Sequence, residues 1–466
     1  MKTIKNIFLV WGIVMLSACN DFLEESSQDL IVPKTVTAFK EFLFGEGLNN
    51  GGSFCQFLDI MTDDTDEMIV TNGSRDWRLD FWAYYTWQQD PEIKKDNTFA
   101  EGKEWGEYYH RTLIANVILD HIPDMKGDEN EKIDLMGEAY FLRAWSYFML
   151  ANLYGLPYVD EERAQTDMCV PLNFEVGIED NTASRATVRQ VYDQMESDII
   201  LSIAMFKRSG IKKTIFRPNL PTAYLLASRI MLFQKKYDET IAFADSVFKH
   251  TEAKMVDLNT YNAVSFYDPK NTEVLFSFGN ELVRGYGRAN ANRAFYVRSA
   301  SLMKLFGEND KRLDFWFDNN QVPRKFYRST LFQQAFRLSE AYLNRAEAYA
   351  EKNKLSEAAA DIRTIRKNRM ADGIEIPMGT QALAIEAIRN ERRVEFCFEG
   401  FRWFDLRRWG CPRIVHTYTS DLDPTDKLTY VLEKNDAAYT LPIPKKERDR
   451  NKVIQRWARP ERPGSK

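Results

Sequence analysis

Three glutamates near the C-terminal end have a spacing that suits acid–base chemistry. Glu391, Glu395 and Glu399 are four residues apart, so a helix would place them on one face. Paired carboxylates are what glycoside hydrolysis requires. Arginines surround them in the sequence, at Arg389, Arg392, Arg393, Arg402, Arg407 and Arg408. Because like charges at this spacing repel unless cations lie between them, we predict a structural arginine–glutamate network without a catalytic acid.

A second group of acids lies in the segment from Met61 to Glu67. Asp63, Asp64, Asp66 and Glu67 offer the oxygen ligands that calcium prefers. The segment lacks the glycine and the distal glutamate of an EF-hand, so we favour a solvated loop or a helix cap over a metal site. Calcium binding stays as an alternative, and so does hydrogen bonding of Asp64 to sugar hydroxyls.

Two aromatic-rich stretches, residues 60–110 and 265–330, are the stronger candidates for ligand binding. A flat aromatic ring can cover the apolar face of a sugar while nearby polar groups bind its hydroxyls. Trp77 and Trp82 are the first choices because Arg75, Asp76, Arg78 and Asp80 flank them. The alternative for any one aromatic here is a place in the core. The predicted ligand contacts are Trp77, Trp82, Tyr84, Tyr286, Tyr296, Arg298 and Asp64.

The elements that position these residues read mainly as helices. Three segments open alike, at Ala139-Tyr140-Phe141-Leu142, Ala223-Tyr224-Leu225-Leu226 and Ala341-Tyr342-Leu343-Asn344, and each continues with one apolar face. The second and third copies stay in step through a polar turn into a second helix, which is the tetratricopeptide pattern. We therefore predict a mainly α fold with helix pairs near 221–249 and 335–367, a loop-rich ligand-binding part and few short strands. The tail after Pro412 is predicted to be extended on the surface.

Composition narrows the class of protein. The 466 residues contain 63 Lys and Arg against 68 Asp and Glu, a net charge of −5. A chain without excess positive charge is unsuited to nucleic acid binding. No apolar run reaches the roughly 20 residues that span a bilayer.

The first residues resemble an export signal. Lys2 and Lys5 precede an apolar stretch, and Leu16-Ser17-Ala18-Cys19 resembles a bacterial lipobox. This predicts a signal peptide at 1–18, a lipid anchor on Cys19 and a polar tether over 19–35; the alternative is an ordinary secretory signal. The remaining cysteines are predicted as disulfides or as buried free thiols, and the sequence does not choose between these for Cys55, Cys169, Cys397 and Cys411.

Several motifs in order along the chain resemble one family. The run from Glu391 to Gly410, ERRVEFCFEGFRWFDLRRWG, resembles the signature of the SusD/RagB family. The stretch from Ala341 to Met370, the turn from Gly307 to Arg312 and the segment Cys19-Asn20-Asp21-Phe22-Leu23 also resemble parts of that family.

This resemblance implies a surface-exposed outer-membrane lipoprotein. It implies four tetratricopeptide-like pairs within a single body over 36–466, with an N-terminal part at 36–210 and a C-terminal part at 211–466. It further implies capture of an oligosaccharide, or in some members a peptide, for a SusC-like TonB-dependent transporter, without catalysis. Two alternatives from other classes are a lipid-anchored glycosidase that uses Glu395 or Asp64, and a tetratricopeptide adaptor for a protein partner.

Overall fold

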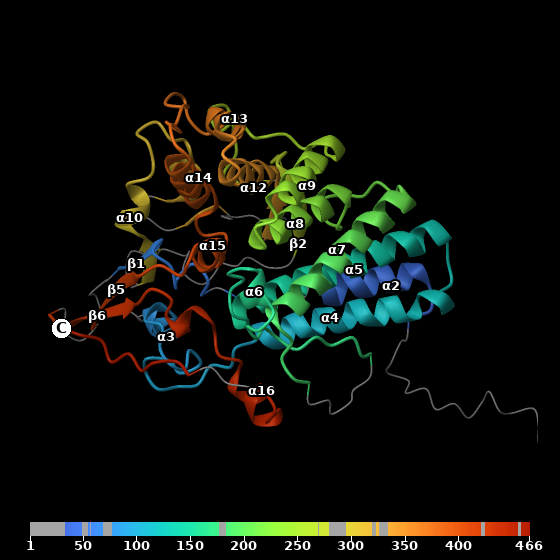
Figure 1. The fold of residues 1–466 in the computed structure, drawn as a ribbon, viewed down its shortest axis with the longest axis horizontal. Helices are drawn as coiled ribbons and strands as arrows, with labels where there is room; N and C mark the ends of the chain where they lie inside the picture. The colour runs from blue at the N-terminus through green and yellow to red at the C-terminus, as the bar shows by residue number, and fades with distance from the viewer. Residues whose placement is uncertain are drawn as a thin grey trace, which may run out of the picture.

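Helices dominate the computed structural model, which describes residues 33–48, 55, 57–68, 77–176, 183–268, 270–278, 295–318, 323–325, 334–420, 425–454 and 458–466 (Figure 1). The longer α-helices are α2 (Val36–Phe42), α4 (Glu104–His121), α5 (Glu129–Tyr154), α7 (Val188–Ser209), α8 (Leu220–Phe233), α9 (Tyr237–His250), α12 (Leu338–Glu351), α13 (Leu355–Lys367), α14 (Gln381–Phe396) and α15 (Arg402–Arg408). The shorter ones are α3 (Trp82–Tyr85), α6 (Glu161–Ala164), α10 (Ala300–Met303), α11 (Arg312–Trp316) and α16 (Lys445–Arg450). The other helical turns are a π-helix, η1 (Leu43–Leu48), and three 3₁₀ turns, η2 (Trp77–Asp80), η3 (Ile122–Asp124) and η4 (Ala437–Tyr439).

The N-terminal part is a bundle built around α5. The Asp128 side chain caps α5 by accepting the backbone N–H groups of Asn130 and Glu131. This helix packs against α4 and α7, which explains why most of its residues from Ile133 onward are buried (Figure 1). A capping box formed by Thr187 and Gln190 starts α7.

The C-terminal part contains two matching helix pairs, α8 with α9 and α12 with α13. The turns between the helices have the same geometry, because Lys235 (φ 59°) and Asn353 (φ 57°) both adopt the left-handed conformation. In each turn the next lysine donates its N–H to a carbonyl of the first helix, Lys236 to Met231 and Lys354 to Tyr349. The pairs stack through α9 and α12, and α14 covers α12 in turn. The predicted mainly helical fold with paired helices is confirmed.

The strands form three two-stranded antiparallel sheets that join distant parts of the chain. Their bounds are β1 (Thr65–Met68), β2 (Val274–Phe278), β3 (Phe295–Arg298), β4 (Gln334–Arg337), β5 (Ile414–Thr419) and β6 (Lys427–Leu432). The pairs are β1 with β3, β2 with β4, and β5 with β6. In the first sheet Thr65 faces Arg298 and Met68 faces Phe295, which brings the two aromatic-rich stretches together.

Two local predictions were wrong. Trp105 and Tyr108 lie on α4 and are buried against the bundle, so residues 104–110 of the first aromatic-rich stretch are helical and do not belong to the predicted loop-rich part. The tail after Pro412 is not merely extended on the surface. Its alternating β-branched and aromatic residues form β5 and β6 and bury Tyr418 and Tyr430.

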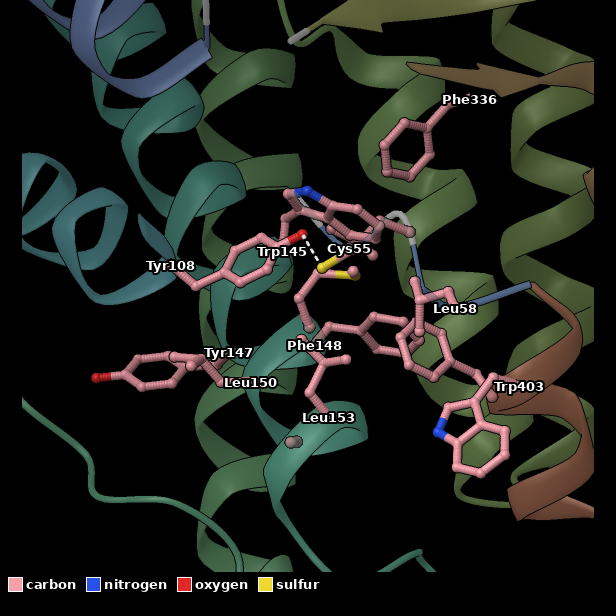
Figure 2. Close-up of a cluster of buried hydrophobic side chains, with 14 of the residues drawn as sticks. Cys55, Leu58, Tyr108, Trp145, Tyr147, Phe148, Leu150, Leu153, Phe336 and Trp403 are labelled. Carbon is pink, nitrogen blue, oxygen red and sulfur yellow. Dashed lines mark hydrogen bonds between the residues drawn. The ribbon is translucent and has the colours of Figure 1, made fainter. Parts of the chain in front are cut away.

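The core runs continuously through the bundle and beneath the sheets. Figure 2 shows part of it, where Trp145 and Phe148 of α5 meet Leu58 and Phe336 from other parts of the chain. None of the helices in the described ranges combines the length and apolar character needed to cross a membrane.

Candidate functional site

The C-terminal glutamates belong to a buried ion network. One Glu395 oxygen lies 2.5 Å from Arg337 and 2.8 Å from Arg369, and Glu399 accepts from Lys325 at 2.6 Å. Glu391 and Glu395 lie on α14, whereas Glu399 follows in the turn after that helix.

These ion pairs set the protonation of the glutamates. Burial alone would raise the pKa of Glu395, but Arg369 and Arg337 hold it well below its usual range. Arg337 and Lys325 lower the pKa of Glu399 against the same effect of burial. The glutamates do form an arginine–glutamate network, but the predicted partners were wrong. In the described part of the chain their cations are Arg312, Lys325, Arg337, Arg366 and Arg369 rather than the flanking arginines. Neither Glu395 nor Glu399 has the raised pKa of a general acid.

The acids of the Met61–Glu67 segment are also paired within the protein. Asp63 accepts from Arg402 at 2.8 and 2.9 Å, and Asp64 accepts from Arg393 at 2.5 Å. Asp64 has 0% of its surface exposed, so its prediction as a ligand contact was wrong. The sequence could not show this because the partner of Asp64 lies 329 residues further along the chain.

Glu67 and Asp66 have partners as well. Glu67 lies 2.6 Å from Arg78, and Asp66 accepts the N–H of Ala300 at the start of α10. Within the described ranges, no three His, Cys, Asp or Glu residues gather in a way that would hold a metal ion.

Asp59 completes the contact between this segment and the C-terminal signature. Its carboxyl oxygens accept the N–H of Gly400 at 3.1 and 3.3 Å. Burial and the neighbouring Asp64 raise the pKa of Asp59 to about 8. Residues 59–64 and 393–402 therefore form one clasp, which fixes the start of β1 and the elements beside it.

The aromatic side chain best placed for a ligand is Trp82 on α3. It is half-buried, and its ring meets the edge of Tyr430 at a centroid distance of 6.4 Å. The Lys95 ammonium lies 4.5 Å from the Trp82 ring centroid and 5.8 Å from that of Tyr418. We call Arg78, Trp82, Lys95, Tyr418 and Tyr430 the Trp82 face.

Contacts with the rest of the protein hold the residues of the Trp82 face in place. Arg78, on η2, is fully buried. Its guanidinium donates to Glu67 and to the carbonyl of Thr419 and lies 4.7 Å from the Tyr418 ring centroid. The loop that carries Lys95 is closed by a bridge between Ile93 and Phe99. Tyr418 and Tyr430 come from β5 and β6 and are buried, so they support Trp82 from below.

Three other predicted contacts, Tyr296, Tyr84 and Arg298, interact with groups inside the protein. Tyr296 is 1% exposed and donates its hydroxyl to the carbonyl of Arg78, so its prediction as a ligand contact was wrong. Tyr84 is half-buried and stacks on Phe57 at 4.2 Å, and burial raises its pKa well above the usual value. Arg298 is half-buried with its guanidinium 4.8 Å from the Phe317 ring centroid.

Two predicted residues cannot be placed by their side chains. Trp77 begins η2, directly before α3, but its side chain lies outside the described part of the structure. Tyr286 lies outside the described residues altogether. Sequence reasoning found Trp82 but missed Lys95, Tyr418 and Tyr430, although the alternation of Tyr418 and Tyr430 within strand-like segments was a usable signal.

An apolar cavity of about 50 Å³ lies elsewhere, between α5, α8, β4 and the turn after α14. Trp145, Phe148 and Phe336, labelled in Figure 2, contribute to its walls. It includes none of the predicted ligand contacts. Its aromatic lining offers few hydrogen-bond partners for sugar hydroxyls, so it does not match a glycan.

Two family models match the chain. Residues 21–232 match a model described as "Starch-binding associating with outer membrane", and residues 319–458 match the model of the SusD family. The SusD-like protein P25 of Formosa agariphila is 27% identical over 163 residues. That match covers 33% of this chain and 31% of the relative, so the chain spans less than a third of that protein's length in the match.

Solved structures resemble the whole fold. A putative sugar binding protein from Bacteroides vulgatus superposes with a TM-score of 0.72 at 21% identity, covering 92% of this chain and 99% of that one. A SusD superfamily protein from Bacteroides fragilis gives 0.71 at 22% identity, with coverages of 92% and 100%. A SusD-like carbohydrate binding protein from Bacteroides vulgatus gives 0.67 at 17% identity, with coverages of 90% and 97%. At these identities the similarity establishes the fold.

Proposed function

Because the chain belongs to the SusD/RagB family, we propose that it is a surface lipoprotein that binds an oligosaccharide and passes it to a SusC-like TonB-dependent transporter. In this proposal the signal peptide at 1–18 is removed and Cys19 carries the lipid anchor. Residues 19–35 form the tether and 36–466 a single body. The protein binds its ligand and makes or breaks no bond.

The observation that carries this proposal is the pair of family matches. They cover the N-terminal and C-terminal parts in order, and one model is described by starch binding and association with the outer membrane. Two of the similar structures are themselves described as sugar or carbohydrate binding proteins. A fold alone does not determine a function, so the evidence for sugar binding has to come from the residues of the site as well.

The Trp82 face supports binding of a sugar ring. It offers a half-buried tryptophan on a rigid aromatic base, which is a suitable surface for the apolar face of a sugar. Within the ion network, Glu395 and Glu399 have lowered pKa values and direct cationic partners. This favours binding over hydrolysis by these residues.

The test is affinity electrophoresis of the purified body, residues 20–466, on a panel of neutral and acidic polysaccharides. We expect retardation on at least one polysaccharide. Trp82→Ala should weaken binding at least about fivefold, because truncating an aromatic anchor in a binding site costs upward of about 1 kcal/mol. Release of shorter oligosaccharides during incubation would contradict the non-catalytic part of the proposal.

Trp409→Ala is the matched control. Trp409 is also half-buried, with the Arg389 and Arg408 guanidinium groups over its ring at 4.9 and 4.6 Å, but it lies at the end of α15. This variant should bind as the wild type does, provided that circular dichroism shows it folded. Absence of retardation on every polysaccharide would overturn the proposal and favour a peptide ligand or a protein partner.

A further inference from the structure

The charge beside Trp82 bears on which glycans the proposed site accepts. We propose that the Trp82 face selects acidic glycans, whose carboxylate or sulfate groups bind the Lys95 ammonium while the sugar ring covers Trp82. This inference rests on the proposed function and adds the chemical class of the ligand.

Lys95 occupies the place where a sugar ring would stack. Its ammonium lies 4.5 Å from the Trp82 ring centroid, although the lysine itself is exposed. The loop holds it there: Lys94 and Thr98 are joined through the backbone, and Asn97 (φ 63°) makes the tight turn. A sugar that stacks on this side of Trp82 must displace the ammonium from the ring.

Among the residues that the structure describes, Lys95 differs from the cations beside it in having no acidic partner. Arg78 is paired with Glu67 at 2.6 Å, and Lys94 with Asp80 at 2.8 Å. Over the residues that the structure describes, Lys95 forms no ion pair, and its ammonium lies over the Trp82 and Tyr418 rings. Its charge is therefore available to a ligand.

The position of the Lys95 ammonium over Trp82 and its availability to a ligand together discriminate between neutral and acidic sugars. A neutral sugar that covers Trp82 removes the attraction between the ammonium and the ring and can offer the ammonium only hydrogen bonds to uncharged hydroxyls. An acidic sugar replaces that attraction with a charge-assisted hydrogen bond to the displaced lysine. The overall charge of −5 gives acidic polymers no net attraction to the protein, so a preference for them has to come from local cations such as Lys95.

The experiment compares each acidic polysaccharide with its own neutral form. Polygalacturonate, alginate and a glucuronoxylan are tested beside their carboxyl-reduced derivatives, and a carrageenan beside its desulfated form, by affinity electrophoresis and titration calorimetry. We expect at least one acidic form to bind and to lose about three- to fivefold in affinity on neutralisation, the size of one exposed ion pair. The preference should weaken at high salt.

Two lysine variants identify the group responsible. Lys95→Met keeps an unbranched apolar side chain beside Trp82 but removes the charge, so it should abolish the preference for the acidic form. Lys94→Met, the control, removes a lysine already paired with Asp80 and should leave the preference intact.

The outcomes separate this inference from the proposed function. Binding of neutral forms as tightly as acidic ones, or a preference that survives in Lys95→Met, overturns the acidic selection and leaves glycan binding in place. If no form of any polysaccharide binds, the proposed function fails and this inference fails with it.

Discussion

Glu347 on α12 shows how single residues carry buried charge in this protein. Both of its carboxylate oxygens accept from Arg408 at 2.7 Å, and one also accepts the indole N–H of Trp409 at 2.9 Å. Burial would raise the pKa of Glu347, but Arg408 and its neighbours lower it to about 2. The pairing therefore stabilises the folded protein above the unfolded pKa of about 4.3, and this contribution disappears as the pH falls towards 2.

Glu347→Gln tests this pairing. At pH 7 we expect the variant to be less stable than the wild type by about 3 kcal/mol, the equivalent of the pKa shift. At pH 3 the difference in stability should shrink by about 2 kcal/mol, because the stabilisation that the ionised Glu347 gives the wild-type protein is largely lost below its unfolded pKa. Urea unfolding of both proteins at the two pH values measures this. A difference that is the same at pH 3 and pH 7 would contradict the assignment.

At the residue scale, the sequence predicted an ion network at Glu391 and Glu395 but not the partners of these residues. The arginines that pair with these glutamates, Arg312, Arg337, Arg366 and Arg369, lie outside the flanking sequence and are brought in by the fold. Burial of Asp64 and Tyr296 was not predictable, because it depends on Arg393 and on the carbonyl of Arg78, which the fold brings from far away. Lys95 was missed because the spacing of residues in the sequence does not predict which lysine will lie over an aromatic ring.

At the element scale, Gly137 allows α5 and α7 to approach closely. A Cβ atom at this position would lie 2.7 Å from the Phe206 ring and 3.2 Å from the Met205 side chain. The Ser202 hydroxyl donates to the Gly137 carbonyl at 2.7 Å across the same contact. The two helices therefore pack closely at this point.

Gly137→Ala should destabilise the protein even though alanine is the better helix former. We expect a cost of about 1–3 kcal/mol from overpacking, measured as a loss in the free energy of unfolding. Gly106→Ala on α4 is the matched control, because nothing lies within 4 Å of its added Cβ atom. That variant should gain about 0.5–1 kcal/mol. Equal effects in the two variants would show that the α5–α7 contact tolerates the methyl group.

The helix pairs were predictable because each repeats one pattern of apolar residues and one polar turn. Both turns have a left-handed residue at the same aligned position, Lys235 in one and Asn353 in the other. Aligning the two copies placed these residues opposite each other, but it could not predict their backbone conformation. The strands of the tail pair with each other, but the side chains that cover their buried residues come from distant parts of the sequence. His416 of β5 stacks on Tyr85 and Trp87, and both rings come from the opposite end of the chain.

At the scale of the whole molecule, the described cysteines lie in the core and are all free thiols. Cys55, Cys169, Cys397 and Cys411 are each at most 6% exposed. Burial raises the pKa of every one, to about 12 for Cys169. Of the two alternatives left open by the sequence, the structure has buried thiols.

A thiol titration with Ellman's reagent checks this arrangement. A form of the protein that begins after Cys19 should show no rapidly reacting thiol when folded, since thiolates are the reactive species. All four should react in guanidinium chloride without a reducing agent. Fewer than four under those conditions would reveal a disulfide and contradict the structure.

The clasp between residues 59–64 and 393–402 ties the completion of the fold to the order of synthesis. Asp63 and Asp64 leave the ribosome early, but the arginines that neutralise them are made near the end of the chain. Until then two unpaired acids must stay in water, where they oppose premature burial of the N-terminal aromatic residues. A protein proposed for export across a membrane gains from this delay, because a chain that has not finished folding can still pass unfolded through an export channel.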